Sequence, residues 1–507
     1  MQIQFLEDST VVYFAIFLNE GKQTLISDYK IVGNTVFSTE EIKTKFATTI
    51  GTPLQQNILE KDIDELLKHY ENKGYPFTKI KIDSLQIDTS QLQLSFIIEI
   101  EEGKQVSISE IQVTGNTITN TNVITREAKL LPNQIYQEEK IVRIQKNIER
   151  LQLFSSVSNP ELYLLDTIST DTIMKGGLKI TVQEMNTNNF DGIIGYIPNA
   201  KGGGSFTGSV NVALRNLFGT GRKLFFRWNR EAELTQELEG KYYEPWIFNF
   251  PVNVGGTFFQ RKQDSSFVKT TVDIKGDFSF FDELVFGITL GNESIYSSSE
   301  LSRLVTFNST TFFYGGEVRY DTRDNIINSI SGIYYSMSYQ QGSKKITGPE
   351  KYLSLISQTQ YTIQKFFVEA NIFFPLWERQ VFAMGFQGKL VNATQVEQSD
   401  LFPFGGTNSL RGYRENQFYA SQTAVLKNEY RIVIGKNSSV FGFFDVGYFF
   451  RPNNTIQNII EQKEFLYGYG IGARVETNLG IISVSYALGK DDAITQGKIH
   501  FGLANNF

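Results

Sequence analysis

The residues with the most specific chemistry lie near position 411, where residues 409–416 read SLRGYREN. The preceding phrase FPFGGT supplies glycines and a proline, so the stretch is expected to form a loop. The loop carries two arginines, and a guanidinium makes strong charge-assisted hydrogen bonds to anionic groups. Such a loop can hold or be held by an acid, and its function depends on where the surrounding elements place it.

Composition excludes several other chemistries. The 507-residue chain has no cysteine, which excludes thiol catalysis and disulfides. Its only histidines, His69 and His500, argue against a zinc site or a serine–histidine triad. The net charge of -6 disfavours a nucleic-acid partner. The run KGGGS at 201–205 lacks the ending and the helix of a phosphate loop. We therefore predict no enzyme, no catalytic residue, no metal site and no cofactor.

Any membrane crossing is expected to use strands. The sequence has no run of about 18 apolar residues, so no transmembrane helix is expected. Aromatic residues make up 14% of the chain, chiefly 42 Phe and 24 Tyr. The mean hydropathy is nevertheless slightly negative, at -0.21. This combination favours alternating membrane strands over helical spans.

The region 1–185 contains a repeated module. The phrases EGKQ and GNT begin at Glu20 and Gly33, and they recur with the same spacing at Glu102 and Gly115. A fixed period is typical of tandem modules. Each copy is expected to run strand, helix, helix, strand, strand, with a capping box at Ser38 in the first copy.

We expect these α+β modules at 25–105 and 106–187. Residues 1–24 align with the last strand of a module, so we interpret them as the C-terminal remnant of a preceding copy in a sequence whose true start is missing. The alternative is an ordinary pair of small α+β domains with a long N-terminal arm.

From 188 to 507 the pattern is that of strands separated by turn residues. In the segment 426–434, the apolar Leu426, Tyr430 and Ile432 alternate with three charged residues, and Asn428 is the exception. A soluble sandwich also alternates, but aromatic residues on the apolar face favour a membrane barrel. At about 20 residues for a strand and its turn, this region predicts an all-β transmembrane barrel of about 16 antiparallel strands.

Several phrases resemble one family, the BamA/TamA-type outer-membrane assembly and translocation porins of the bacterial surface antigen family. GNTVFSTEEI and YENKGYPF resemble its POTRA domains. NLFGTGRKL, YDTRDN, FGGTNSLRGY, LKNEYRI and FGFFDVG resemble its barrel, so the resemblance covers essentially the whole chain. It implies a barrel in the bacterial outer membrane with POTRA domains in the periplasm. It also makes YDTRDN, which would otherwise suggest cation ligands, a periplasmic turn.

The resemblance gives the loop arginine a place. In this family the sixth extracellular loop folds into the lumen, where its Arg-Gly-aromatic tip packs on the wall and pairs with an acid. By motif position the tip is Arg411, Gly412 and Tyr413, and the acid is Asp445. Alternation independently points Asp445 inward, where a lone carboxylate is costly without a cation. We call the expected Arg411–Asp445 contact the loop latch; the alternative is a solvated arginine on an outer loop.

The strand that follows Asp445 is expected to make room for that loop. Gly468, Gly470 and Gly472 share one parity with Glu476, so all four are expected to face the lumen. Three inward glycines would leave a groove beside the loop latch.

Two mechanisms are open on this scaffold. In an insertase, a lateral seam between the first strand, with Gly192 and Gly195, and the last strand, with Gly502 and Phe507, would open to pair with a client strand. The POTRA domains would then hand over unfolded outer-membrane or secreted clients beside the lipid bilayer, and accessory periplasmic or lipoprotein subunits could assist them. The alternatives are a two-partner-type polypeptide secretion channel and, less favoured, a passive porin.

Overall fold

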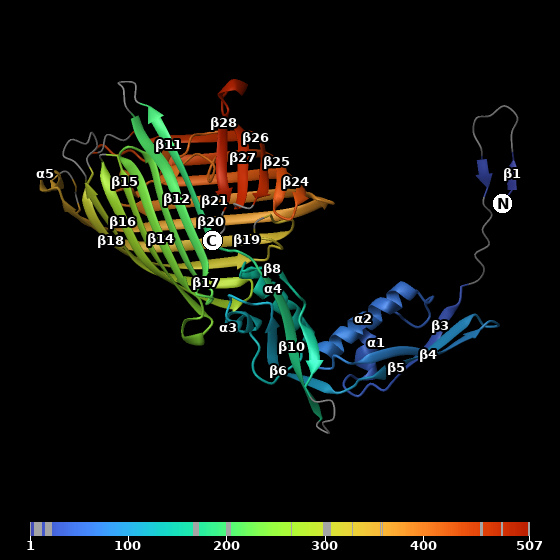
Figure 1. The fold of residues 1–507 in the computed structure, drawn as a ribbon. Coiled ribbons are helices and arrows are strands. Elements are labelled where there is room, and N and C mark those ends of the chain that lie inside the picture. Colours follow the sequence, from blue (N-terminus) through green and yellow to red (C-terminus); the bar gives the residue numbers. More distant parts are fainter. Residues whose placement is uncertain are drawn as a thin grey trace. The chain divides into compact units, whose positions relative to one another are not determined.

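The fold is described from a computed structural model (Figure 1). It describes residues 2–4, 13–15, 23–165, 172–198, 204–264, 266–297, 306–326, 328–354, 356, 358–456, 460–477 and 480–504. The chain divides into two units, Met1–Met185 and Asn186–Phe507. Within the described ranges no helix is long and apolar enough to cross a bilayer.

The first unit begins with β1 (Gln2–Gln4) and β2 (Tyr13–Ala15), which pair antiparallel. The rest of 1–22, and with it most of the interpreted module remnant, lies outside the described residues.

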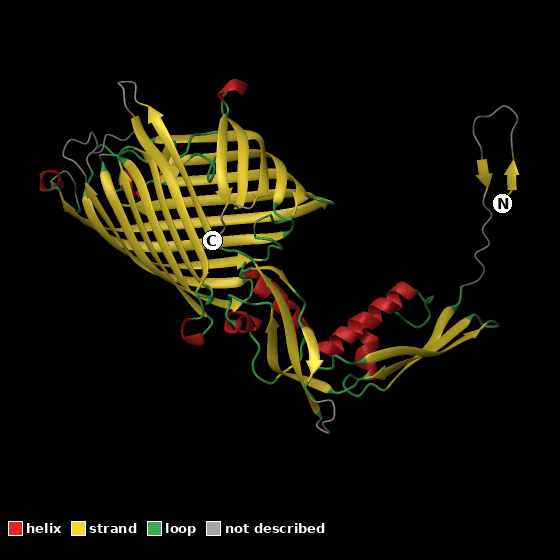
Figure 2. Cartoon of the chain, in the orientation of Figure 1, coloured by secondary structure: helices red, strands yellow, loops and turns green. Residues whose placement is uncertain are grey.

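The first repeat follows the expected order. Its elements are β3 (Leu25–Val32), α1 (Thr39–Lys45), α2 (Gln56–Asn72), β4 (Lys79–Asp88) and β5 (Gln93–Glu101). The sheet order is β3-β5-β4, with β3 parallel to β5 and β4 antiparallel to it. The helices lie against one face of this sheet, and Ser38 and Glu41 form the capping box that begins α1 (Figure 2).

The second repeat has the same plan with shorter α-helices and additional short strands. Its elements are β6 (Gln105–Thr114), α3 (Thr121–Thr125), η1 (Arg126–Ala128), β7 (Gln134–Ile135), α4 (Glu138–Arg150), β8 (Phe154–Val157), β9 (Glu161–Leu164) and β10 (Ile173–Glu184). Parallel β6 and β10 form the centre of the sheet, and Ile144 and Ile148 of α4 are completely buried in the core with Leu178.

The repeated phrase GNT has a steric cause. Gly33 and Gly115 have φ values of +84° and +90°, and a Cβ there would lie 2.1 Å from the Ile100 carbonyl oxygen and 1.9 Å from that of Val182. Only glycine fits such a position. The phrase therefore recurs because both repeats need the same turn geometry.

The second unit is a sixteen-stranded antiparallel sheet that curves round to form a barrel wall (Figures 1 and 2). Its strands are β11 (Asn189–Pro198), β12 (Gly204–Leu217), β13 (Arg222–Ala232), β14 (Thr235–Glu244), β15 (Val252–Gln263), β16 (Phe267–Phe281), β17 (Leu284–Ser297), β18 (Asn308–Asp321), β19 (Gly332–Gly348), β20 (Gln360–Trp377), β21 (Gln380–Ala393), β24 (Gln422–Gly435), β25 (Ser438–Arg451), β26 (Gln462–Thr477), β27 (Gly480–Gly489) and β28 (Lys498–Ala504). This confirms the predicted strand number.

Short helical turns occupy some connections of the sheet: η2 (Ile247–Asn249), α5 (Glu350–Leu353), η3 (Gln398–Asp400) and η4 (Ile494–Gln496). In the sheet β24 pairs directly with β21, because β22 (Phe402–Phe404) and β23 (Phe418–Ala420) form a separate hairpin in the long connection between them. The strand order ends at β11 and β28, and no described ladder joins these two strands.

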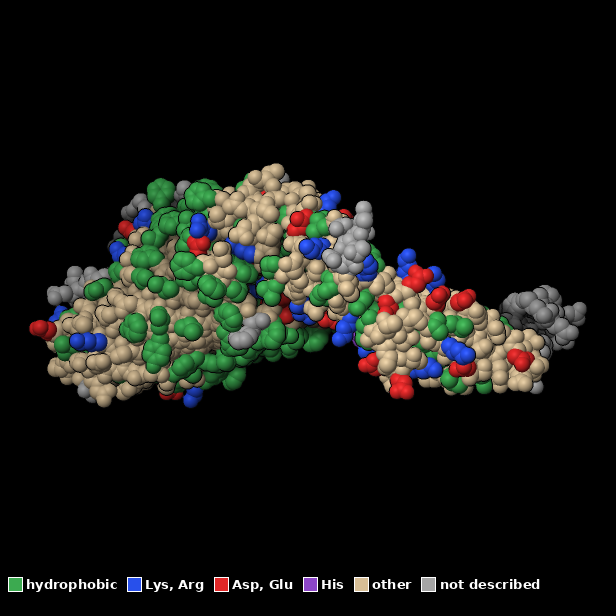
Figure 3. Space-filling model, turned by 90° about the horizontal axis from the view of Figure 1, so that it is seen from below, with side chains coloured by type: hydrophobic (Ala, Val, Ile, Leu, Met, Phe, Trp, Pro, Cys, Tyr) green, Lys and Arg blue, Asp and Glu red, His purple; other side chains and the backbone are tan. Residues whose placement is uncertain are grey.

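Side chains alternate across the barrel wall as period two requires. On β25, Phe444 is 49% exposed, whereas its neighbours Phe443 and Asp445 are 6% and 0% exposed. Apolar side chains gather on the outer surface of the strands (Figure 3). Asn428, the exception to the alternation, donates from Nδ2 to the carbonyl oxygen of Phe444 at 3.2 Å, so it is satisfied by the neighbouring strand.

Candidate functional site: a loop inside the barrel

The candidate site is the tip of the connection 394–421 between β21 and β24. The β22–β23 hairpin carries the tip, residues 405–417, which is closed by its own hydrogen bonds. The N–H of Gly405 donates to Ser409 Oγ at 2.7 Å, and the N–H of Gly406 donates to the Leu410 carbonyl oxygen at 3.0 Å. The tip is therefore a compact unit rather than an extended strand.

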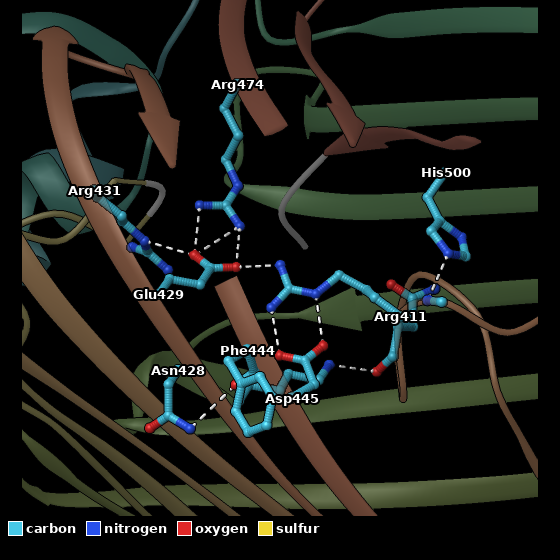
Figure 4. A network of polar contacts seen from close by, with 11 residues as sticks. Arg411, Asn428, Glu429, Arg431, Phe444, Asp445, Arg474 and His500 are labelled. Atoms are coloured by element: carbon cyan, nitrogen blue, oxygen red, sulfur yellow. Dashed lines mark hydrogen bonds and ion pairs between the residues drawn. The ribbon is translucent and has the colours of Figure 1, made fainter. Parts of the chain in front are cut away.

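Arg411 at this tip meets the acid that the sequence assigned to it (Figure 4). Its Nε donates to Asp445 Oδ2 at 2.7 Å and its Nη2 donates to Oδ1 at 2.6 Å, a bidentate pair with both side chains buried. The guanidinium carbon also lies 3.7 Å from the centre of the Phe443 ring. A planar cation stacked on an aromatic face and paired with a carboxylate is a strong and directional contact.

A second acid, Glu429 on β24, joins this pair. Arg411 Nη1 donates to Glu429 Oε1 at 2.5 Å, Arg431 Nε donates to Oε2 at 2.7 Å, and Arg474 Nη2 donates to Oε1 at 3.0 Å (Figure 4). Three guanidinium groups thus surround one buried carboxylate. Sequence reasoning placed Glu429 among the charged residues of its strand but did not assign it to the loop; its shared parity with Arg431 was the available signal.

The backbone of the tip fits against the last strands. Gly412 has a φ of +93°, and a Cβ there would lie 2.6 Å from the Leu488 carbonyl oxygen. Its N–H donates to His500 Nε2 at 3.1 Å. The Tyr413 hydroxyl donates to the Tyr467 carbonyl oxygen at 3.1 Å and accepts from the Lys490 N–H at the same distance.

The three glycines of β26 have two different neighbours. A Cβ on Gly468 would lie 1.8 Å from the Arg411 carbonyl oxygen, so this glycine admits the loop itself. At Gly470 a Cβ would lie 2.0 Å from the Tyr486 carbonyl oxygen and 2.9 Å from a ring carbon of Phe443, and at Gly472 it would lie 2.6 Å from a ring carbon of Phe441. These two glycines make room for the neighbouring strand and for the rings on which the arginines stack, rather than for the loop.

Glu476 lies apart from the loop tip. It is exposed, and its Oε1 accepts a hydrogen bond from Asn437 Nδ2 at 2.8 Å near the β24–β25 turn.

The seam residues are not brought together by described contacts. Gly192 and Gly195 lie on β11 opposite Val210 and Thr207 of β12, and Gly502 lies on β28 opposite Ser483 of β27. Phe507 lies outside the described residues.

Besides the role of Glu429, two further features of the site were not predicted. The sequence analysis used His500 only to argue against a zinc site. The signal available for its position was that it shares the parity of Gly502 on the last strand. A polar cavity of ≈ 170 Å³ lies beside the loop latch and is lined by Arg411, Lys427, Glu429, Arg431 and Arg474 among others.

In the part of the chain that the structure describes, no group of three or more His, Cys, Asp or Glu is placed to hold a metal ion.

Comparison with known proteins places this geometry in a family. The Omp85 superfamily domain matches residues 216–507, and the POTRA model, described as a surface antigen variable number repeat, matches 24–103 and 106–185. A relative from Neisseria meningitidis serogroup B, outer membrane protein assembly factor BamA, is 23% identical over 443 residues, which are 81% of this chain and 53% of that protein. A putative outer membrane protein assembly factor of Treponema pallidum is 26% identical over 250 residues, 47% of this chain and 28% of that protein. The chain thus spans about half the length, or less, of these curated relatives.

Solved structures share the fold. BamA from Haemophilus ducreyi lacking POTRA domains 1-3 aligns with a TM-score of 0.56 at 15% identity, covering 94% of this chain and 98% of that chain. CdiB from Acinetobacter baumannii aligns with a TM-score of 0.52 at 13% identity, covering 99% and 92%. Since the superfamily model matches more than half of the chain, the protein belongs to the Omp85 superfamily, as an outer-membrane β-barrel preceded by periplasmic POTRA repeats.

Proposed function

We propose that this chain is an assembly factor that inserts other proteins into the outer membrane. The POTRA repeats would receive an unfolded client, and an edge of the barrel sheet would pair with the client's strands. Opening would occur between β11 and β28. The names of the relatives and the order of the domains support this function.

The observation that carries the proposal is the weak pairing of the two terminal strands, β11 and β28. Across the described residues, the ladder between β27 and β28 is the shortest in the sheet, and neither β28 nor β11 has a described partner on its other side. A short ladder contributes less pairing energy, and an unpaired strand edge is a template for another chain. Gly192 and Gly195 weaken β11, because glycine gives a strand no side chain to pack.

The loop tip adds a link to the same seam. The Gly412 N–H bond to His500 joins the tip to β28, while Arg411 joins it to β24 and β25. Movement of β28 away from the barrel would break the first contact and leave the others. The tip is therefore suited to support the last strand while the seam is closed.

A secretion channel is the second candidate. The likeness to CdiB extends over 99% of this chain and shows a shared fold, which suits either activity. In a channel the loop would have to leave the lumen, whereas in an insertase it can stay.

The test is reconstitution of the purified chain in liposomes, followed by addition of a small urea-unfolded outer-membrane barrel. An insertase should accelerate client folding over empty liposomes, measured by heat-modifiable electrophoretic mobility. A photoreactive residue at Ile499 on β28 should cross-link the client, while the same residue at the exposed Ile288 in mid-sheet serves as the matched control. Equal folding rates in the two liposome types, together with no cross-link from position 499, would refute the proposal. Entry of a soluble polypeptide into the vesicles would favour the channel.

A further inference from the structure

A second buried ion cluster holds the same loop at another place. Glu397 and Asp400 lie on the arm that leads from β21 to the hairpin, and both face Lys344 of β19. Lys344 Nζ lies 2.9 Å and 2.8 Å from the two Asp400 carboxylate oxygens and 3.1 Å from Glu397 Oε1. The Lys344 side chain is 0% exposed, and the Tyr361 hydroxyl donates to Glu397 Oε1 at 3.3 Å.

The wall behind this cluster carries surplus positive charge without the loop. Lys269 of β16 and Lys365 of β20 pair with Glu293 of β17 at 2.9 Å and 3.1 Å. With Lys344, the wall thus offers three cations against one acid, and the two loop carboxylates restore neutrality. Uncompensated buried charge is costly, so the wall and the arm each need the other. Lys269 Nζ also donates to the Ser399 carbonyl oxygen at 3.2 Å.

This cluster is distinct from the loop latch in space and in chain. In the sheet order, β20, β21 and β24 lie between β19, which carries Lys344, and β25, which carries Asp445. Four strand spacings correspond to about 19 Å along the wall. Between Asp400 and Arg411 the chain passes through Gly405 and Gly406, whose φ values are +107° and +101°. This glycine pair is a ready hinge between the two contacts.

We propose that Lys344, Glu397 and Asp400 form a second anchor, the arm anchor, which keeps the arm of the loop inside the barrel independently of the loop latch. The two anchors have opposite polarity, since the tip supplies a cation to acids and the arm supplies acids to a cation. Breaking the loop latch frees the tip about the glycine hinge and leaves the arm in place. Full exit of the loop requires both anchors to open. This inference concerns the position of the loop and stands whether the protein is an insertase or a channel.

The absence of cysteine makes a direct test possible. Single cysteines at Ser399 on the arm and Ser409 at the tip report local exposure through their rate of thiol labelling in the full-length folded protein. Ser399 Oγ is buried and has no hydrogen-bond partner among the described atoms, so its replacement removes none. Ser409 Oγ accepts the Gly405 N–H, and a cysteine sulfur is a weaker acceptor, so each variant at this reporter is compared with the Ser409→Cys protein that carries no other change. Each reporter is combined with Arg411→Ala, with Glu397→Gln plus Asp400→Asn, and with Lys345→Met as the control. Lys345 is the exposed neighbour of Lys344.

Arg411→Ala should raise labelling at 409 by about tenfold or more and leave labelling at 399 within about twofold. The Glu397→Gln plus Asp400→Asn variant should raise labelling at 399 by about tenfold or more and leave labelling at 409 within about twofold. Lys345→Met should change labelling at neither position. Equal exposure of both reporters by Arg411→Ala, or continued protection of 399 in the Gln/Asn variant, would overturn the arm anchor. If the Gln/Asn variant does not fold, adding Lys344→Met removes the unpaired cation; this triple variant must fold and expose 399.

Discussion

Two turns in different parts of the molecule solve the same steric problem with different electrostatics. The loop tip in the barrel and the GNT turn of the second repeat each contain a positive-φ glycine, Gly412 and Gly115, with no room for a Cβ. Each turn is also fixed by a carboxylate, Asp445 in the barrel and Glu184 in the repeat. What differs is the donor: a guanidinium in the first case and the turn's own amides and hydroxyl in the second.

Burial explains that difference. Asp445 is completely buried and needs a full countercharge, which Arg411 provides. Glu184 is partly exposed to solvent and accepts from the N–H groups of Ile118 and Thr119 at 2.9 Å and 2.6 Å and from the Thr117 hydroxyl at 2.6 Å. A partly hydrated carboxylate can be satisfied by neutral donors. The comparison predicts large effects in the barrel and small, pH-dependent effects in the repeat.

The largest effect should follow removal of the buried cation. Arg411→Ala leaves Asp445 and Glu429 without their shared partner, and breaking a buried pair in this way costs about 3–5 kcal/mol. Amide hydrogen exchange of residues 405–417 should accelerate by at least about a hundredfold. Arg414→Ala, at an exposed position of the same loop, is the control and should leave exchange unchanged. Equal exchange in both variants would show that the tip is held by packing alone.

A steric lesion should sharpen the contrast between the two turns. Gly468→Ala places a Cβ against the Arg411 carbonyl oxygen and should destabilise the bound position of the tip by about 1–3 kcal/mol. The tip should then be released while the barrel stays folded. Gly115→Ala places a Cβ against the Val182 carbonyl oxygen, and the whole small repeat should lose protection. Gly442→Ala is the control, since no atom lies within 4 Å of the added carbon. Exchange mapped over the full chain distinguishes local from domain-wide opening.

The sequence predicted these features to different depths. Once Phe444 and Val446 are assigned to the lipid side, period two turns Asp445 inward, since successive side chains of a strand must point to opposite faces. The sixteen strands followed from length and turn spacing. The arm anchor could not be predicted from the sequence. Pairing Lys344 with Glu397 and Asp400 depends on how the loop returns to a strand much earlier in the chain, and no local sequence pattern encodes that path. Glu429 was visible as a charged residue facing inward, but its choice of Arg411 as partner depends on how β24 and β25 bring their side chains together.

His500 tests whether the tip also depends on a neutral partner, as the repeat does. The Gly412 N–H points at Nε2, so this nitrogen accepts and the ring proton lies on Nδ1. His500→Ala leaves a buried N–H unpaired, which costs about 1–3 kcal/mol, whereas the amide oxygen in His500→Gln can restore an acceptor. Exchange at Gly412 should rise strongly in the first variant and less in the second. Identical behaviour of the two variants would mean that ring packing, not the hydrogen bond, is what matters.

The smallest effect should be the pH dependence of the GNT turn. Burial raises the pKa of Glu184, but hydrogen bonds from Thr117, Thr119 and Ile118 outweigh it and lower the pKa to about 2. An unfolded glutamate titrates near 4.3, at about its ordinary value. Because the folded pKa is the lower one, the stabilisation is complete above that value and is lost as the pH falls through about 2.

Glu184→Gln should therefore destabilise the second repeat by about 1 kcal/mol near neutral pH. The difference from the wild-type protein should shrink as the pH falls between about 4 and about 2, where the wild-type carboxylate becomes protonated. Exchange of amides 115–119, corrected for intrinsic pH dependence, measures the difference in the full chain. A difference that is constant with pH, or that grows on acidification, would show that the carboxylate charge does not hold this turn, and the contrast with the buried Asp445 would then lie in donor geometry rather than in charge.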